Sequence, residues 1–391
     1  MLFRGMGRGN RYKKLSMQRN LDKVIGSALC SVFALRNSVS KRHFPKKVDV
    51  VLFLKLSAIG DAILSLPMMK KAKEATKCRI VVVCSKENCD VFEGQKFIDR
   101  IILSDTGKLN PISIFNKVKE IRREHADLVI DAGQSAYLSA ALASMAGRYS
   151  IGFKNNKARM RNKALDKSLE QNIGRHVVFN YFDLISPLGI YPDEDEVRLV
   201  KMSYGEDNQA KSVAMIRGAK GIVGVHPCNA LDYREWPKER FAEVISNLVN
   251  RYDKKVVIVG GKDEAEKVEH LMGSLDEKTK KSVIDVAGKM GIKDLAALSE
   301  RFELFIANDG GPMHIAASMG VPTIGIFGRE TPERYAPFNS RSVSVYKKIK
   351  CSPCYRSYDC YWVHCEDALC LKEISAKDVL DEVEKILGNR R

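Results

Sequence analysis

The sequence predicts an α/β fold made of two domains, each built on a parallel sheet. Short apolar runs alternate with helical patterns along the chain, the arrangement that gives parallel strands joined by helices. At 391 residues the chain is too long for one ordinary core and suits two domains. Its 45% hydrophobic and 29% charged residues are typical of a soluble globular protein. The runs of strand length lie at 50–56, 80–84, 127–131, 221–226, 255–260, 302–307 and 321–327.

The domain boundary is predicted between residues 186 and 221, where prolines, a glycine and the acidic cluster 193–196 interrupt the alternation. A last helix is expected from residue 376 to 387, because Ser375 and Asp378 have the pattern of an N-cap and an acidic first turn. The predicted segments are 48–195 for the first domain, 196–220 for a linker, 221–371 for the second domain and 372–391 for the last helix.

The first strand–turn–helix unit places a carboxylate at its turn. An apolar run at 50–56 has the length of a buried strand, and the helical pattern 62–73 follows after a turn that contains Gly60. Asp61 falls in the first turn of that helix, at the carboxyl edge of the sheet, where open α/β sheets bind ligands. An ionised Asp at this place can accept a proton, or it can do no more than satisfy the helix dipole.

A second strand–turn–helix unit, at 302–319, has the pattern of a diphosphate cradle. The apolar strand ends at Asn308, two glycines leave the backbone open to a ligand, and Pro312 is of the type favoured at the start of a helix. Free amides at a helix start attract phosphate, although the same residues also form plain capped turns. The residues assigned to this cradle are Asp309, Gly310, Gly311, Met313 and His314.

Residues 1–47 form a basic extension. They hold twelve lysines or arginines and one acid, Asp22, so they supply most of the formal net charge of +17. Apolar residues recur at helical spacing between Leu21 and Phe33, but this apolar segment is too short to span a bilayer. Such a helix can lie on an anionic membrane surface, or it can equally pack on the protein body or belong to a disordered, solvated arm. No nucleic-acid-binding motif accompanies the basic residues, so we expect no nucleic-acid partner.

Five of the ten cysteines lie close together near the end of the second domain, in the segment 351–370. One Cys-X-X-Cys pair is present, whereas zinc sites usually have a second tight pair. In a reducing cytosol the segment would hold free thiols or a structural zinc site rather than disulfides. The five are Cys351, Cys354, Cys360, Cys365 and Cys370, with His364 among them.

The two strand–turn–helix units, with Asp61 in the first and Asp309 to His314 in the second, resemble two motifs of glycosyltransferase family 9, the heptosyltransferases of lipopolysaccharide core assembly. They stand in the same order and at similar places along the chain. The resemblance covers roughly residues 48–385 and rests on several ordered motifs. Many family members also have a cysteine-rich segment in the same place, which implies a structural clamp. The further segments that match are 128–133, 139–147, 151–153, 223–227, 234–237, 241–243, 256–261, 285–288, 295–298 and 321–328.

The family resemblance implies the GT-B architecture, in which two Rossmann-like domains face each other across a cleft. The first domain would bind the acceptor and the second the donor, and the last helix often crosses back to the first domain. The implied enzyme is an inverting, metal-independent glycosyltransferase that needs no cofactor besides its nucleotide-diphospho-sugar co-substrate, with ADP-heptose the leading donor. The implied acceptor is an anionic lipid-linked saccharide, which would place the enzyme in the cytoplasm, peripheral at the inner membrane face.

The resemblance also implies roles for single residues. Asp61 matches the general base, and the cradle residues would bind the donor diphosphate. Arg234 matches a basic position that contacts donor phosphate, where a guanidinium can bind bidentately. Ser57, Gly60 and Lys55 are expected to position the acceptor, although Lys55, inside a strand, can equally be an ion-pair partner.

The sequence departs from the family pattern at three places. Ala58 and Gly310 stand where the family commonly has hydroxyl residues, and the segment 228–235 is unlike the family. Another nucleotide-sugar donor for a different surface glycan therefore stays open. So does a non-catalytic protein that binds a sugar nucleotide or a membrane surface, but Asp61 favours the enzyme because a binding protein needs no base.

Overall fold

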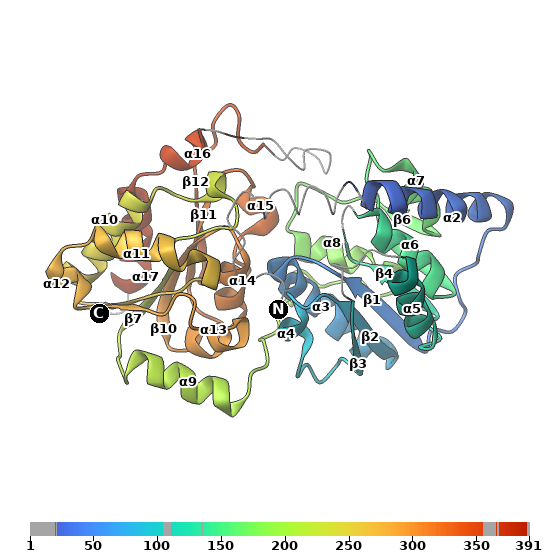
Figure 1. The fold of residues 1–391 in the computed structure, drawn as a ribbon, viewed down its shortest axis with the longest axis horizontal. Helices are drawn as coiled ribbons and strands as arrows, with labels where there is room; N and C mark the ends of the chain where they lie inside the picture. Colours follow the sequence, from blue (N-terminus) through green and yellow to red (C-terminus); the bar gives the residue numbers. More distant parts are fainter. Residues whose placement is uncertain are drawn as a thin grey trace.

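The computed structural model describes residues 20, 22–104, 111–133, 136–354, 365 and 367–388. Two six-stranded parallel sheets, each flanked by helices, form two domains that lie side by side (Figure 1). The strands of the first sheet are β1 (Val50–Lys55), β2 (Arg79–Cys84), β3 (Arg100–Leu103), β4 (Leu128–Asp131), β5 (Tyr149–Phe153) and β6 (Lys167–Leu169). Those of the second are β7 (Ile222–His226), β8 (Lys255–Ile258), β9 (Val283–Asp285), β10 (Phe302–Asn308), β11 (Thr323–Phe327) and β12 (Val343–Tyr346).

The helices follow the same division. Before and within the first domain lie η1 (Asp22–Gly26), α2 (Ser27–Val39), α3 (Ile59–Thr76), α4 (Cys89–Phe92), α5 (Pro111–Arg122), α6 (Tyr137–Ala146), α7 (Arg159–Ala164), α8 (Val177–Asp183) and η2 (Ser186–Leu188). After them come α9 (Glu206–Ile216), η3 (Asp232–Arg234), α10 (Lys238–Asn250), η4 (Lys262–Glu264), α11 (Ala265–Gly273), α12 (Glu277–Lys280), α13 (Ile292–Ser299), α14 (Gly311–Ser318), α15 (Pro332–Tyr335), α16 (Leu369–Lys372) and α17 (Ala376–Gly388).

Both sheets have the same strand order. The first runs β3-β2-β1-β4-β5-β6 and the second β12-β11-β10-β7-β8-β9. In each sheet the direction of winding therefore reverses beside the pair of central strands, β1 with β4 and β7 with β10. Ligands of open α/β sheets bind outside the carboxyl ends of the strands at this reversal. The turn after β1 and the turn after β10, which the sequence singled out, are both at such a place.

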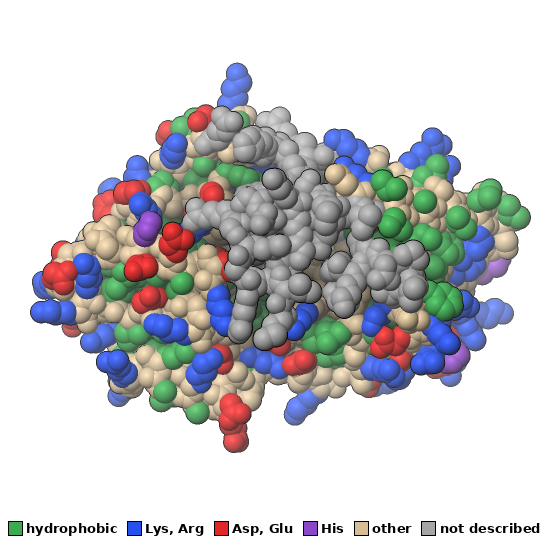
Figure 2. Space-filling model, viewed as in Figure 1, with side chains coloured by type: hydrophobic (Ala, Val, Ile, Leu, Met, Phe, Trp, Pro, Cys, Tyr) green, Lys and Arg blue, Asp and Glu red, His purple; other side chains and the backbone are tan. Residues whose placement is uncertain are grey.

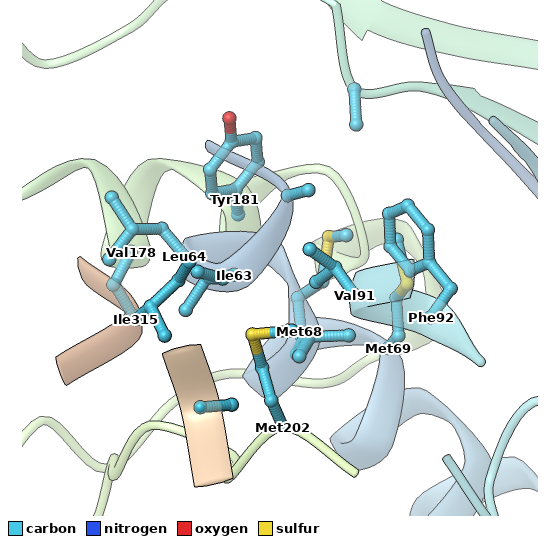
Figure 3. Packing of buried hydrophobic residues seen from close by; sticks show 14 of the residues in the cluster. Ile63, Leu64, Met68, Met69, Val91, Phe92, Val178, Tyr181, Met202 and Ile315 are labelled. Carbon is cyan, nitrogen blue, oxygen red and sulfur yellow. The ribbon is translucent and has the colours of Figure 1, made fainter. Parts of the chain in front are cut away.

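Helices α3 and α14 join the two domains. One hydrophobic cluster contains buried residues from both, because Ile315 of α14 packs against the first domain. Figure 3 shows Ile315 beside Leu64 of α3 and Val178 of α8. The domains therefore share apolar contacts exactly where their two turns face each other.

The strands predicted from the sequence are confirmed, with ends that differ by one to two residues. Strands β3, β6, β9 and β12 were not predicted, since they are short and only partly buried and so lack a continuous apolar run. Residues 196–220, predicted as a linker, contain α9, which packs on α13 of the second domain.

The last helix begins as predicted, with mutual hydrogen bonds between Ser375 and Asp378. It does not cross back to the first domain as expected, since α17 packs on α10 and on strands β10 to β12. Its apolar face, which includes Val379 and Val383, is buried in the core of the second domain. The nearby Trp236 indole N–H donates to the carbonyl of Ile374 at 2.9 Å and helps to hold the chain there.

The basic extension enters the described part of the chain at residue 20. Helix α2 packs along α6 and α7 of the first domain, so one of the arrangements left open by the sequence, a helix packed on the body, is present. None of the helices that the structure describes combines the length and the apolar character needed to cross a bilayer.

Candidate functional site

The helix that starts with the first turn and the helix that starts with the second turn touch each other. A Cβ atom added to Gly60 would lie 2.7 Å from His314 Cδ2 of α14. A Cβ on Gly311 would lie 3.3 Å from the Cβ of Ile59. These glycines let two helix N-termini from different domains approach more closely than side chains would allow.

Asp61 lies in the first turn of α3, as predicted. Its side chain is 20% exposed, so solvent or a ligand can reach the carboxylate. The Tyr181 hydroxyl of α8 donates to Asp61 Oδ1 at 3.2 Å, and Lys55 Nζ lies 3.8 Å from Asp61 Oδ2. In Figure 3 the Tyr181 ring belongs to the apolar cluster while its hydroxyl points away from it. Two groups from separate elements thus fix the orientation of the carboxylate.

Lys55 is buried at the end of β1. Its ammonium donates to the carbonyl of Ala132 at 3.2 Å and lies over the ring of Tyr181. Burial lowers the pKa of Lys55, although the charges of Asp61 and Asp131 act in the opposite direction. Of the two sequence hypotheses for this residue, the geometry favours the ion-pair partner, because the ammonium faces Asp61 and not solvent.

The turn between β1 and α3 is strained. Ala58 has a φ of 63° and a ψ of 117°, a backbone conformation that residues with a Cβ rarely adopt. Strain of this kind accumulates at functional sites, where the surrounding structure enforces it. Ser57, just before it, is exposed at the rim of the turn.

The second turn leads into α14, an eight-residue helix with Gly310 as its N-cap residue. Within the described residues no side chain caps this helix start, and the first amides of a helix have no acceptor inside it. The amides of Gly311 and Met313 are therefore available to an anion, while the Met313 side chain is buried in the core. The backbone of Gly310 is extended, and a Cβ atom there would make ordinary contacts only. The site therefore has room for the serine or threonine that is common in the family, and glycine at this position removes a hydroxyl without a steric reason.

Asp309 and Arg234 form an ion pair beside this turn. The Asp309 carboxylate does not cap α14, because it is turned towards the guanidinium of Arg234. The charge of Asp309 raises the pKa of Arg234, so the guanidinium stays protonated. Asn229 donates to the Asp309 carbonyl at 2.8 Å and ties the loop after β7 to the same place.

His314 is buried one turn into α14, with 3% of its surface exposed. Burial lowers the pKa of His314, against the opposing charges of Asp309 and Asp61, so the ring is neutral near pH 7. Its Nδ1 atom has no hydrogen-bond partner in the part of the chain that the structure describes. A neutral imidazole with one unused nitrogen can still donate to or accept from a ligand.

The structure adds Glu330 to the site, which the sequence did not single out. It follows β11 in the same sheet edge, and burial raises its pKa to about 7, while the cations of Arg334 and Arg234 act in the opposite direction. Asp309 also raises this pKa, so the two carboxyl groups sense each other. The position after the strand 321–327 was a signal in the sequence that could have found it.

A second addition is the pair of His226 and Glu264 at the ends of β7 and β8. His226 Nε2 lies 3.1 Å from Glu264 Oε2, and the Gly261 amide donates to the same oxygen at 2.7 Å. Although burial acts to raise it, these hydrogen bonds lower the pKa of Glu264 to about 2. A fixed anion therefore lies next to the end of β7, the strand that pairs with β10, and such a carboxylate suits hydroxyl groups of a ligand.

Four of the five cysteines in the cysteine-rich segment are among the described residues. Cys351, Cys354, Cys365 and Cys370 are free thiols that influence each other electrostatically, and burial raises the pKa of Cys370 to about 11. Cys360 falls outside the described residues. Among those described, no three His, Cys, Asp or Glu residues are grouped to hold a metal ion, so structural zinc stays a prediction that elemental analysis of the purified protein can test.

Comparison with known proteins now places this geometry in a family. Residues 114–362 match the profile of glycosyltransferase family 9 (heptosyltransferase). The chain belongs to glycosyltransferase family 9. As a member of that family it is a glycosyltransferase, and its two Rossmann-like domains form the GT-B architecture that the sequence predicted.

The relatives of this family 9 member include the lipopolysaccharide core heptosyltransferase OpsX of Haemophilus influenzae, 24% identical over 78% of this chain and 87% of that protein. Among solved structures, a family 9 glycosyltransferase of Veillonella parvula has a TM-score of 0.75, with 21% identity over 88% of this chain and 99% of that one. The Escherichia coli heptosyltransferase WaaC with ADP has a TM-score of 0.65, with 16% identity over 86% of this chain and 99% of that one.

Proposed function

We propose that the protein transfers heptose from ADP-heptose to a lipopolysaccharide-core acceptor, with inversion at the anomeric carbon and without a metal ion. The relative OpsX is named as a lipopolysaccharide core heptosyltransferase, and WaaC, which shares the fold, was solved with ADP. One observation carries the mechanism: the start of α3, with its carboxylate, packs against the start of α14, with its open amides.

The second domain would stabilise the leaving nucleoside diphosphate. As the bond between the sugar and ADP breaks, negative charge grows on the diphosphate, and preorganised donors lower the barrier when they point at that charge. The amides of Gly311 and Met313 and the positive end of α14 supply such donors. Arg234 adds a cation, although it has to share its guanidinium between Asp309 and the phosphate.

The first domain would activate the acceptor. The acceptor oxygen attacks the anomeric carbon from the face opposite to ADP, the new glycosidic bond forms as the bond to ADP breaks, and the hydroxyl proton passes to Asp61. A carboxylate is a weak base for an alcohol, so the proton moves late, when the attacking oxygen has become acidic. Tyr181 and Lys55 hold the two Asp61 oxygens in place for this step. Ser57 and Gly60, at the rim of the same turn, would position the acceptor.

The acceptor sets the location of the enzyme. Lipopolysaccharide-core acceptors carry a lipid, so the enzyme would work in the cytoplasm at the inner face of the inner membrane. The saccharide is anionic, and the basic balance of the chain, +17 at pH 7, favours its approach.

A donor panel tests the proposal. The purified chain is incubated with a heptose-deficient lipopolysaccharide acceptor and with ADP-heptose, UDP-glucose or GDP-mannose in turn. We expect transfer from ADP-heptose alone, at a rate that EDTA does not change, with inverted configuration by NMR.

Each other outcome has a separate meaning. Transfer from a different donor would support the alternative of another surface glycan. Binding of ADP-heptose without transfer to any acceptor would leave only a sugar-nucleotide-binding protein, and loss of transfer in EDTA would refute the metal-independent mechanism.

A further inference from the structure

Helices η1 and α2, within the described part of the basic extension, pack on the first domain. The Asp22 carboxylate accepts hydrogen bonds from the amides of Tyr137, at 3.0 Å, and Leu138, at 2.8 Å, so it caps the start of α6. At the other end of α6, Arg36 donates to the Ser144 carbonyl at 3.2 Å. An acid at a helix N-terminus and a cation at its C-terminus both oppose the helix dipole favourably. Charged side chains from η1 and α2 thus contact both ends of α6.

The inner face of α2 is made for close packing. Cys30 and Ala34 are buried, and Gly26 precedes them at the same helical spacing. A Cβ on Gly26 would lie 2.7 Å from the Cβ of Tyr137, so a larger residue there would push the helix away from α6. The orientation of α2 is therefore determined, and with it the face that points outward.

The outer face of η1 and α2 is also apolar. A row of exposed apolar side chains repeats every three or four residues on the side opposite to the packed one. Their exposed fractions are 69% for Val24, 62% for Val32, 67% for Leu35 and 82% for Val39. Met160 of the adjoining α7 is also exposed. We call these five residues the outer stripe. Figure 2 shows hydrophobic side chains gathered over α2 and α7, with lysines and arginines around them.

The surroundings of the outer stripe are basic. Lys23, Lys41, Arg159 and Lys163 are exposed on η1, on α7 or just after α2, and neither α2 nor α7 contains an acidic residue. The nineteen residues that precede Asn20 in the sequence add six lysines or arginines and no acid. An apolar row with a basic rim matches the interface of an anionic bilayer, which takes apolar side chains below the headgroups and cations among them.

We propose that the outer stripe rests on an anionic lipid surface and holds the first domain against it. A second copy of the chain fits less well, because a symmetric contact through this face would bring the basic rims of two copies together. The inference deepens the proposed function, since it names the surface by which the enzyme reaches a lipid-linked acceptor. Binding to lipid can nevertheless be measured without any transfer reaction.

Vesicle co-sedimentation of the full chain tests this surface. We expect binding to vesicles of phosphatidylethanolamine with phosphatidylglycerol, weaker binding in high salt, and little binding to vesicles of phosphatidylcholine alone. The variant Val32→Ser with Leu35→Ser removes apolar area without touching the packed face, and its affinity for the anionic vesicles should fall by about tenfold or more.

A matched control has the same two changes on the other domain. Val213 on α9 and Leu369 on α16 are exposed by 41% and 48%, and the double variant Val213→Ser with Leu369→Ser should bind vesicles like the parent. Melting temperatures of all three proteins establish that they fold alike. If the outer-stripe variant misfolds, Lys41→Glu with Lys163→Glu serves in its place, since it reverses two charges of the rim and should also weaken binding.

Two results would overturn the proposal. One is vesicle binding by the outer-stripe variant that equals that of the parent. The other is a parent protein that sediments as a dimer while the outer-stripe variant sediments as a monomer, which would make the outer stripe a contact between two copies of the chain. Transfer to a water-soluble, delipidated acceptor separates this inference from the proposed function. The outer-stripe variant should transfer to this acceptor as the parent does. If the parent itself does not transfer, the proposed function is refuted, and the vesicle measurement still decides whether the outer stripe binds lipid.

Discussion

The two turns that face each other between the domains share one plan and carry different groups. Each follows a central strand of its sheet and leads into a helix that packs at the domain interface. The first turn presents a carboxylate that Tyr181 and Lys55 hold in place, whereas the second presents bare amides and keeps its charges, Asp309 and Arg234, paired with each other. In the proposed mechanism the first turn takes up a proton and the second faces a growing negative charge. One repeated fold element would then supply both halves of the transfer reaction.

The strongest test of this comparison removes the carboxylate of the first turn. Asp61→Asn keeps the size of the side chain but cannot accept the proton, so we expect kcat to fall about 10²- to 10⁴-fold. ADP affinity should stay unchanged, because ADP would contact the other turn. Initial rates and calorimetric titration with ADP measure the two effects. A variant that transfers as fast as the parent would show that Asp61 is not the base.

The second test concerns the carboxyl group beside the second turn. Burial raises the pKa of Glu330 to about 7 from an ordinary 4.5, so the folded state holds a proton that the unfolded state has lost between those values. The contribution of Glu330 to stability therefore declines as the pH rises from 4.5 to 7. At pH 8 Glu330→Gln should raise the free energy of unfolding by on the order of 1–3 kcal/mol, and at pH 4 it should change little.

Urea unfolding at the two pH values measures this effect. Glu333→Gln, three residues further on at an exposed position, is the control and should change the free energy of unfolding little at either pH. An equal gain for Glu330→Gln at both pH values would exclude a buried, protonated carboxyl as the cause.

The third test asks whether the paired cation of the second turn also serves the nucleotide. Arg234→Lys keeps the charge next to Asp309 but loses the planar fork that binds phosphate with two hydrogen bonds. We expect ADP to bind about tenfold more weakly. Arg251→Lys, which alters an exposed ion pair with Glu384, is the control and should leave ADP affinity unchanged. Equal affinity in the parent and in Arg234→Lys would confine Arg234 to its pair with Asp309.

The smallest expected effect concerns the backbone of the first turn. Ala58→Gly relieves the strained conformation at a φ of 63°, and we expect a gain of about 1 kcal/mol in the free energy of unfolding. Ala62→Gly, inside α3, should have the opposite sign, because glycine in a helix costs about 1 kcal/mol and this site is buried. Thermal and urea unfolding compare the two. Destabilisation by both changes would mean that Ala58 is not strained.

The sequence predicted the parts of this site that depend on neighbouring residues. A strand of apolar residues, a glycine turn and a helix start are local patterns, so Asp61 and the residues from Asp309 to His314 were found correctly as the starts of two helices. The contacts of these turns depend on the tertiary fold. Tyr181 reaches Asp61 from 120 positions along the chain, and nothing around it in the sequence marks the contact.

The residues that were missed or misplaced share this dependence on packing. The position of Glu330 after a strand could have marked it as a candidate, but the removal from solvent that raises its pKa cannot be read from its neighbours in the sequence. The last helix was recognised by its cap, but its docking on the second domain follows from the apolar side chains of α10 and β10 to β12 that it covers. The orientation of α2 was likewise open until its packed face was known.

The hydrogen bonds that Asp22 makes with α6 bear on where the chain can be shortened. The resemblance to family 9 starts at about residue 48, and a truncated form that began there would look complete by sequence. It would uncover two backbone amides of α6 and the apolar pocket that Cys30 fills. Shortened forms for crystallisation or for assay should therefore keep the chain from Asn20 onward, since what looks like an appendage closes one wall of the first domain.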